Sequence, residues 1–308
     1  MASIVISEFM DAPAVARLQR AHAVDYRPTL VDDPQALAAA AAGADVLIVR
    51  NRTQVRGPLL DALQRCKVVG RLGVGLDNID VAGCQARGIQ VIPATGANAN
   101  SVAEYVIACA FMLLRGAYHA TEATRAGQWP RTALSQGREI HGKTLGLVGF
   151  GSIGQKVAVL ARVLGMRVQA HDAQMAPDHP AFQALGVEAV GLDALLAGAD
   201  VLSLHVPLVP GTVNLINAQR LATMKAGAVL INTARGGVVD EAALAAALRE
   251  GRLGGAALDV FEQEPLGASN AFADCPRLIL TPHIAGLTEE SNTRVSDLIA
   301  DRVLEALA

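Results

Sequence analysis

Aromatic residues are scarce in this chain: Phe, Trp and Tyr make up 3% of it, although 52% of its residues are hydrophobic. A core with few large rings has to be built from Ala, Val, Leu and Ile, which suits buried parallel strands covered by Ala-rich helices. The 308 residues are enough for two domains of ordinary size. The composition therefore favours an α/β protein.

Other absences exclude whole classes of partner. The net charge of −3 and the pI near 6.2 give no electrostatic case for binding nucleic acid or an anionic membrane surface. The most apolar helical stretch, residues 102–114, contains Glu104 and is shorter than the roughly 20 residues that a membrane span needs. The amino terminus lacks a basic segment followed by a long apolar run, so no secretory signal is expected. We expect a soluble, cytoplasmic protein.

Cysteine is also rare. Its four occurrences form no CxxC pair and have no zinc spacing: they are Cys66, Cys84, Cys109 and Cys275. We expect buried, reduced thiols and no metal site.

Short β-branched runs alternate with Ala- and Leu-rich helical runs, which is typical of parallel βαβ units. The first series has predicted strands at 4–7, 46–50, 68–72 and 90–92, with helices at 14–20, 34–42, 59–64 and 79–87. A long helix is predicted over 102–126. The second series has strands at 144–149, 167–171, 201–204, 229–232, 256–258 and 278–280, and helices at 155–164 and 289–308. Two series predict two doubly wound, parallel-sheet α/β domains of Rossmann or flavodoxin type, with a ligand cleft between them.

The second series opens on a nucleotide fingerprint. Gly149 permits a tight turn, Gly151 lets the backbone approach a pyrophosphate, and Gly154 lets helix and strand pack closely. The phosphates would lie against the amides of Ser152 and Ile153 at the positive end of the helix. The strand, turn and helix follow in the right order, so the pattern predicts a dinucleotide site.

Asp172 ends the next strand, about 20 residues after the fingerprint, where a carboxylate binds the ribose hydroxyls of the adenosine. It would repel a 2′-phosphate, and no Arg or Lys follows it closely. NAD is therefore favoured over NADP.

Three charged or titratable side chains follow later strands of the same series: Arg235, Glu264 and His283. A guanidinium binds a carboxylate through two hydrogen bonds. A carboxylate beside an imidazole fixes its orientation and favours its protonated form, which suits a general acid–base. With a nicotinamide, these groups are sufficient to move a hydride to or from a hydroxy acid.

The first series carries a possible anion site. Arg50 and Arg71 end two of its strands and should point toward the ligand crevice. Backbone amides of the Gly-rich turn at Gly73, Val74 and Gly75 could hold a carboxylate. In the second series, we expect Asp259 to bind the nicotinamide carboxamide, and the capping of a loop is the alternative.

Seven motifs, spread over the whole chain, together resemble the D-isomer-specific 2-hydroxyacid dehydrogenases: GRLGVGLDNID, NSVAEYVI, LGLVGFGSIG, LHVPLVPGT, LINTARGGVVDE, GAALDVFEQEP and TPHIAG. The resemblance implies a substrate-binding domain made of residues 1–98 and 286–308, with an NAD-binding domain, 99–285, inserted between. It also implies a homodimer that uses the long helix. The implied catalytic residues are Arg235, Glu264 and His283, and Val74 and Gly75 would bind the substrate carboxylate. Implied cofactor contacts are Ser152, Ile153, Asp172, Val206, Pro207, Thr212, Thr233 and Asp259.

Within the family, RNRTQV and GRLGVGLDN resemble the phosphoglycerate dehydrogenase branch, in which Arg50 and Arg71 match anion-binding arginines. We expect a small 2-hydroxy acid with a second anionic group on its third carbon. The resemblance of the segments IVISEFMD and RNRTQV to members that act on (S)-sulfolactate favours that substrate, and 3-phosphoglycerate and hydroxypyruvate or glyoxylate are the alternatives. A protein that only senses NAD could keep all three catalytic residues. Formate dehydrogenases have a glutamine in place of the acid, so Glu264 argues against that activity.

Overall fold

A computed structural model of the protein describes residues 1–116 and 120–308. These residues form two compact units. Unit 1 contains residues 1–98 and 287–308, and unit 2 contains residues 99–286.

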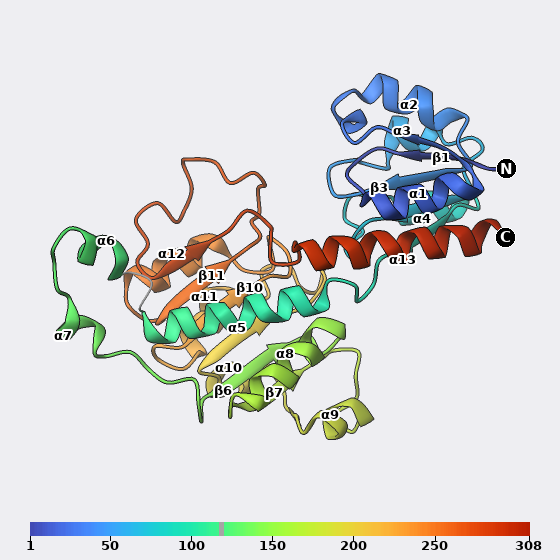
Figure 1. The fold of residues 1–308 in the computed structure, drawn as a ribbon. Helices are drawn as coiled ribbons and strands as arrows, with labels where there is room; N and C mark the ends of the chain where they lie inside the picture. Colours follow the sequence, from blue (N-terminus) through green and yellow to red (C-terminus); the bar gives the residue numbers. More distant parts are fainter. Residues whose placement is uncertain (117–119) are drawn as a thin grey trace. The chain divides into compact units, whose positions relative to one another are not determined.

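Unit 1 is built on a five-stranded parallel sheet with the order β2-β1-β3-β4-β5 (Figure 1). Its strands are β1 (Ser3–Ile6), β2 (Ala23–Tyr26), β3 (Val46–Val49), β4 (Val68–Arg71) and β5 (Gln90–Pro93). The edge strand β2 was not predicted from the sequence. Its residues, AVDY, are half-buried or exposed, so they lack the apolar run that marks the central strands.

Helices cover both faces of this sheet. One face carries α2 (Pro34–Ala42), α3 (Gly57–Ala62), α4 (Val81–Ala86) and the short 3-10 helix η1 (Leu30–Asp32), and the other carries α1 (Ala12–Ala21) and α13 (Glu289–Leu307). Val295, Ile299 and Val303 of α13 pack into the same core cluster as Ile4 and Ile6 of β1. The last helix therefore completes the core of the unit that contains the first strand.

Unit 2 has a seven-stranded parallel sheet with the order β12-β11-β10-β9-β6-β7-β8. Its strands are β6 (Thr144–Val148), β7 (Arg167–His171), β8 (Glu188–Ala189), β9 (Val201–Leu204), β10 (Val229–Asn232), β11 (Gly255–Leu258) and β12 (Leu278–Leu280). The order reverses between β6 and β9, and ligands of open α/β sheets bind beyond the carboxyl ends of the strands at such a point. Two parallel sheets, each in a unit with helices, confirm the predicted α/β fold class.

The unit 2 sheet lies between two helical layers (Figure 1). One layer contains α5 (Ala99–Arg115), α8 (Ser152–Val163) and α9 (Pro180–Leu185), and the other contains α10 (Leu192–Gly198), α11 (Ala218–Thr223) and α12 (Glu241–Arg249). Two short helices, α6 (Ala120–Arg125) and α7 (Arg131–Leu134), follow α5 along the chain.

The prediction of one helix over 102–126 is wrong. The helix α5 ends at Arg115, and the next residue, Gly116, has φ 63°, a left-handed conformation that ends a helix. Residues 117–119 lie outside the described residues.

Within 1–116 and 120–308, no helix is both long enough and apolar enough to span a membrane. In the same ranges, His, Cys, Asp and Glu side chains form no group of three or more that could hold a metal ion.

Candidate active site

The glycine-rich turn after β6 is crowded at two of its three glycines and open at the third. Gly149 has φ 95°, and a Cβ there would lie 2.4 Å from the carbonyl oxygen of His205. A Cβ at Gly154 would lie 2.4 Å from the oxygen of Gly149, so only glycine allows the helix to pack this close to the turn. At Gly151, by contrast, a Cβ would meet nothing within 4 Å. The turn is closed toward the protein and open at the position where a pyrophosphate would approach.

The helix α8 begins directly after this turn, at Ser152, and is 12 residues long. Its N-cap is Gly151, which has no side chain to cover the first amides, those of Ser152 and Ile153. Amides at the positive end of a helix suit a phosphate group.

Asp172 follows β7 and is fixed beside the same turn. One oxygen, Oδ2, accepts a hydrogen bond from the amide of Phe150 at 2.8 Å, and Oδ1 accepts one from the amide of Gln174 at 2.8 Å. The Phe150 ring is buried and stacks on Phe182 with centroids 4.7 Å apart. The carboxylate is therefore held against the fingerprint, as a ribose-binding acid should be.

The ends of β9 and β10 carry two buried polar atoms that have no hydrogen-bond partner among the described residues, His205 Nδ1 and Thr233 Oγ1. These residues follow Leu204 and Asn232, which are paired in the sheet. The other ring nitrogen of His205 is 2.9 Å from Ser203 Oγ. Burial lowers the pKa of His205 to about 4, so its imidazole is neutral near pH 7. Buried polar atoms are nearly always satisfied, and a bound cofactor at the switch point would satisfy these two.

The loop after His205 is braced by its own side chain. Thr212 Oγ1 donates to the carbonyl of Pro207 at 2.6 Å and accepts from the amide of Val209 at 2.9 Å. Val206 packs beside the fingerprint turn, with its Cγ1 3.1 Å from where a Cβ on Gly149 would lie. Val206 therefore lies beside the fingerprint turn, and Thr212 holds Pro207 in the loop that follows.

Arg235 lies in a turn that a buried amide side chain closes. Asn232, which is 2% exposed, accepts from the amide of Ala234 at 3.0 Å and donates to the carbonyl of Arg235 at 3.0 Å. Arg235 Nη1 donates to the carbonyl of Ala234 at 2.5 Å. A Cβ on Gly236 would lie 1.7 Å from the carbonyl oxygen of Phe261. The arginine loop and the loop that leads to Glu264 therefore meet backbone to backbone.

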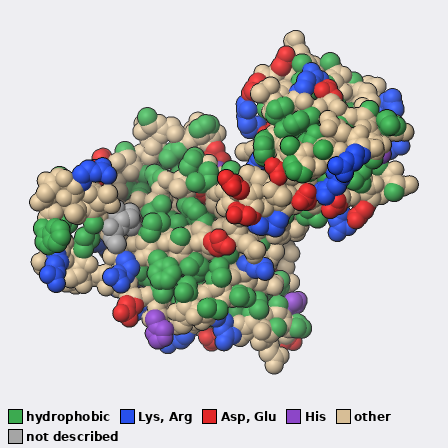
Figure 2. Space-filling model, in the orientation of Figure 1, with side chains coloured by type: hydrophobic (Ala, Val, Ile, Leu, Met, Phe, Trp, Pro, Cys, Tyr) green, Lys and Arg blue, Asp and Glu red, His purple; other side chains and the backbone are tan. Residues whose placement is uncertain are grey.

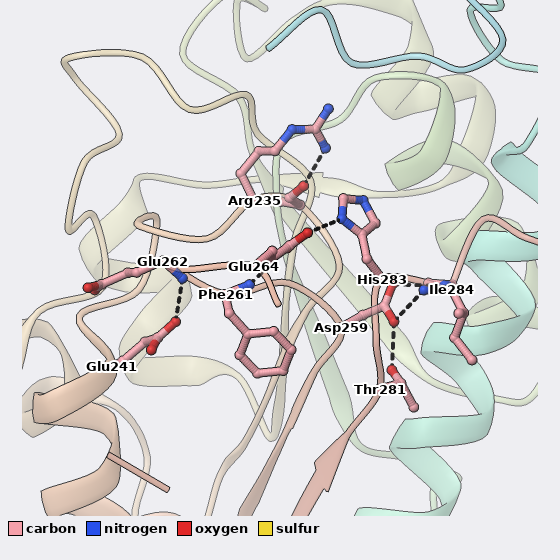
Figure 3. Close-up of polar contacts among 11 residues, drawn as sticks. Arg235, Glu241, Asp259, Phe261, Glu262, Glu264, Thr281, His283 and Ile284 are labelled. Carbon is pink, nitrogen blue, oxygen red and sulfur yellow. Dashed lines mark hydrogen bonds and ion pairs between the residues drawn. The ribbon is translucent and has the colours of Figure 1, made fainter. Parts of the chain in front are cut away.

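Glu264 and His283, predicted to interact, are hydrogen bonded. His283 Nδ1 is 2.8 Å from Glu264 Oε2, and the other carboxylate oxygen accepts from the amide of Phe261 at 3.1 Å. Figure 3 shows the pair together with Arg235. Arg235 follows β10, Glu264 follows β11 and His283 follows β12. The side chain of His283 is 43% exposed and that of Glu264 is 38% exposed, so solvent and small molecules can reach both. Glu264 contacts Nδ1, so Nε2 is the ring nitrogen that could face a ligand.

Asp259 lies below this pair and binds the histidine loop. It is 1% exposed; Oδ1 accepts from the hydroxyl of Thr281 at 2.6 Å and from the amide of Ile284 at 2.8 Å, and Oδ2 accepts from the amide of Ala285 at 2.8 Å (Figure 3). Of the two roles left open by the sequence, these contacts favour the loop-capping one.

In unit 1, Arg50 follows β3 and is held by three groups. Its guanidinium donates to Asn292 Oδ1 at 2.7 Å and lies 5.5 Å from the centroid of the Phe9 ring. Its backbone amide donates to Glu8 Oε1 at 2.8 Å. Glu8 is 4% exposed and also accepts from the amides of Arg52 and Thr53, at 3.1 and 3.0 Å. The burial of Arg50 lowers the pKa of its guanidinium, and the charge of Glu8 opposes that effect.

Arg71 ends β4, the strand beside β3. Its Nη1 donates to the carbonyl of Leu72 at 3.0 Å. The guanidinium folds over Gly73, which has φ 156°, so that a Cβ on Gly73 would lie 1.4 Å from Nη1. Val74 and Gly75, which follow, are partly exposed. The predicted anion-binding residues of this unit therefore lie at the ends of two neighbouring strands.

Comparisons with known proteins agree with this geometry. A family model described as "D-isomer specific 2-hydroxyacid dehydrogenase, NAD binding domain" matches residues 107–285. An (S)-sulfolactate dehydrogenase from Chromohalobacter salexigens is 54% identical over 100% of this chain and 99% of its own length. A D-3-phosphoglycerate dehydrogenase from Mycobacterium leprae is 42% identical over 90% of this chain, which spans about half (52%) of that longer protein.

A crystal structure of a D-lactate dehydrogenase from Aquifex aeolicus, in complex with NAD and lactic acid, superimposes with a TM-score of 0.83. It is 30% identical, and the match covers 99% of this chain and 95% of that one. The chain belongs to the D-isomer-specific 2-hydroxyacid dehydrogenases. It is an NAD-dependent oxidoreductase that acts on CH–OH donors.

Several residues that support the site were not predicted: Glu8, Asn232, Tyr105 and Thr281. Glu8 and Asn232 had a usable signal, because each is a polar residue at the end of an apolar strand. Thr281 had the same signal, because it follows the apolar strand β12. Tyr105 had none, since its contact with Thr281 joins residues 176 positions apart.

Proposed function

We propose that this protein interconverts a 2-hydroxy acid and its 2-keto acid, with Arg235, Glu264 and His283 as the catalytic residues. The observation that carries the proposal is the 2.8 Å contact between His283 Nδ1 and Glu264 Oε2. It orients the imidazole and leaves Nε2 to protonate the carbonyl oxygen during reduction, or to accept the hydroxyl proton during oxidation. Arg235 binds the substrate carboxylate through its guanidinium.

The proposed cofactor site combines the fingerprint turn with the ends of β7, β9 and β10. NAD supplies the hydride acceptor, and NADH the donor, at this site. The amides of Ser152 and Ile153 bind the pyrophosphate, and Asp172 binds the adenosine ribose. The open space at Gly151 and the buried polar atoms of His205 and Thr233 support this assignment.

The proposed substrate carries a second anionic group on its third carbon, and (S)-sulfolactate is the favoured candidate. The 54% identity to a sulfolactate dehydrogenase over the whole chain supports it. Arg50 and Arg71 would bind the sulfonate, and the amides near Gly73, Val74 and Gly75 the carboxylate. D-3-Phosphoglycerate is the second candidate, because the D-3-phosphoglycerate dehydrogenase from Mycobacterium leprae is 42% identical.

We also propose a homodimer that uses α5. Phe111, on this helix, is 39% exposed, and Trp129, which follows it, is 78% exposed. Figure 2 shows hydrophobic side chains gathered over this side of unit 2. Sedimentation equilibrium of the wild-type protein and of Phe111→Glu tests the assembly. A wild-type monomer would contradict it.

A substrate panel tests the proposed function. The protein is assayed with NADH and sulfopyruvate, 3-phosphohydroxypyruvate, hydroxypyruvate and pyruvate, and with NAD and the corresponding D- and L-hydroxy acids. We expect the highest kcat/KM for sulfopyruvate and (S)-sulfolactate. A preference for pyruvate or hydroxypyruvate over both dianionic keto acids would contradict the anionic site but not the dehydrogenase activity.

A further inference from the structure

A short chain of hydrogen bonds joins α5 to the loop that carries His283. Tyr105, on α5, has its hydroxyl 2.5 Å from Thr281 Oγ1. Thr281 Oγ1 donates to Asp259 Oδ1 at 2.6 Å. Asp259 in turn accepts the amides of Ile284 and Ala285, the two residues that follow the histidine.

The directions of these bonds follow from the protons available. A threonine hydroxyl has one proton, and that of Thr281 is given to Asp259. Thr281 Oγ1 must therefore accept from Tyr105. Burial raises the pKa of the Tyr105 hydroxyl, so it keeps the proton that it donates. The chain runs in one direction, from the phenol through Thr281 to the carboxylate.

The backbone of His283 needs such support. Its φ is 57°, in a region that non-glycine residues seldom adopt and that persists only where the surroundings fix it. Thr281 precedes His283 by two residues, and the carbonyl of Thr281 accepts the amide of His283 at 3.0 Å. With Asp259 binding the amides on the other side, the strained residue is held at both ends.

The helix gives the phenol a rigid base. On α5, Ala103 and Val106 are 1% and 0% exposed, and both belong to the core cluster shared with α8 and the sheet. A side chain on such a helix is more precisely placed than one on a loop.

We propose that Tyr105 is a positioning residue for the dehydrogenase reaction. It acts through Thr281 and Asp259 to hold His283 where Nε2 reaches the substrate oxygen. This inference rests on the proposed role of His283 as the acid–base.

The first test removes the hydroxyl alone. Tyr105→Phe is compared with wild type in stopped-flow single turnovers of NADH oxidation. The substrate is whichever of sulfopyruvate, 3-phosphohydroxypyruvate, hydroxypyruvate and pyruvate the wild type reduces fastest. We expect the hydride-transfer rate to fall about 10-fold, because a small misplacement of a catalytic group is costly. The Kd for NADH and the KM for the keto acid should stay within about twofold, since neither depends on the placement of Nε2.

Tyr26→Phe is the matched control. The hydroxyl of Tyr26 also donates a partly buried hydrogen bond, to the carbonyl of Met10 at 3.1 Å, but this residue lies in unit 1. Its loss should leave the single-turnover rate unchanged. An equal loss in both variants would mean that the effect is general destabilisation, and would overturn the proposal.

A double-mutant cycle tests the route. If Tyr105 acts through the Thr281 hydroxyl, Tyr105→Phe should have no further effect on the rate in a Thr281→Val background. Thr281→Ser, which keeps the hydroxyl, should restore the sensitivity to Tyr105→Phe. Additive losses in the Val background would overturn the proposal.

His283→Ala distinguishes a failure of the proposed catalytic role of His283 from a failure of the positioning role of Tyr105. If it retains the wild-type rate, the proposed catalytic role of His283 is wrong. If it is inactive while Tyr105→Phe turns over at the wild-type rate, only the positioning role is wrong.

Discussion

The two units use the same device at the ends of their strands. In unit 1, the buried carboxylate of Glu8 accepts the backbone amides of Arg50, Arg52 and Thr53. In unit 2, the buried carboxylate of Asp259 accepts two amides and a hydroxyl from the loop around His283. A carboxylate that receives several such bonds fixes a loop more firmly than neutral acceptors do.

The two carboxylates differ in what their loops carry. The loop on Glu8 carries Arg50, whose guanidinium donates to the side chain of Asn292. The loop on Asp259 carries His283, whose ring contacts Glu264. A buried carboxylate that accepts loop amides is therefore common to both units, whereas the imidazole–carboxylate pair belongs to unit 2. Under the proposed function, unit 1 would select the anion and unit 2 would transform it.

The strongest test of this division is His283→Ala. Loss of a general acid–base should lower kcat by about 10²–10⁴ on every substrate, with NADH binding retained. The measurement is steady-state reduction of sulfopyruvate and pyruvate, with NADH affinity followed by fluorescence. Near-normal kcat on either substrate would remove the proton-transfer role from unit 2.

Arg71→Ala tests the other half of the comparison. Removal of one partner of a desolvated charge pair costs about 2–5 kcal/mol, or roughly 30- to several-thousand-fold in kcat/KM. We expect this loss on (S)-sulfolactate or D-3-phosphoglycerate and a much smaller one on D-lactate, which lacks the second anion. Equal losses on both kinds of substrate would mean that Arg71 supports the fold or binds the shared carboxylate.

Paired substitutions of the two buried carboxylates compare the supports themselves. Asp259→Asn should lower kcat on all substrates by up to about 100-fold, since hydrogen bonds to a charged group contribute about 1.5–3 kcal/mol. Glu8→Gln should lower kcat/KM for the dianionic substrates only. The assay is the same substrate panel, with circular dichroism to check folding. A loss of activity on all substrates in Glu8→Gln would contradict the assignment of anion selection to unit 1.

The smallest effect concerns acid stability, which we assign to unit 2. His205 has its pKa lowered by burial to about 4 in the folded protein, against about 6.5 when unfolded. The unfolded chain therefore binds the extra proton first, and stability falls as pH drops from about 6.5 toward 4. Linkage gives a loss of about 2 kcal/mol between pH 7 and pH 5.

Urea unfolding of the cofactor-free protein at these two pH values measures the loss. His205→Gln should reduce the difference between them. A variant that loses as much stability on acidification as the wild type would show that another group is responsible.

Much of this arrangement was predictable because it is local. The period and composition of the strands predicted every strand except β2 and β8 to within one residue at each end, and strand ends located Arg235, Glu264 and His283. The catalytic roles themselves stay predictions. What could not be predicted depends on packing: β2 is polar enough to resemble a loop, and Gly116 ends a helix whose apolar pattern continues. The contact of Tyr105 with Thr281 has no trace in either local sequence.

The position of α13 has a consequence for how the chain folds during synthesis. Unit 1 needs Val295, Ile299 and Val303 to close its core, yet these residues leave the ribosome after all of residues 99–286. Unit 2 is continuous and can complete its own core first. We expect unit 2 to fold before unit 1, because the core around β1 is complete only after the last helix has been synthesised.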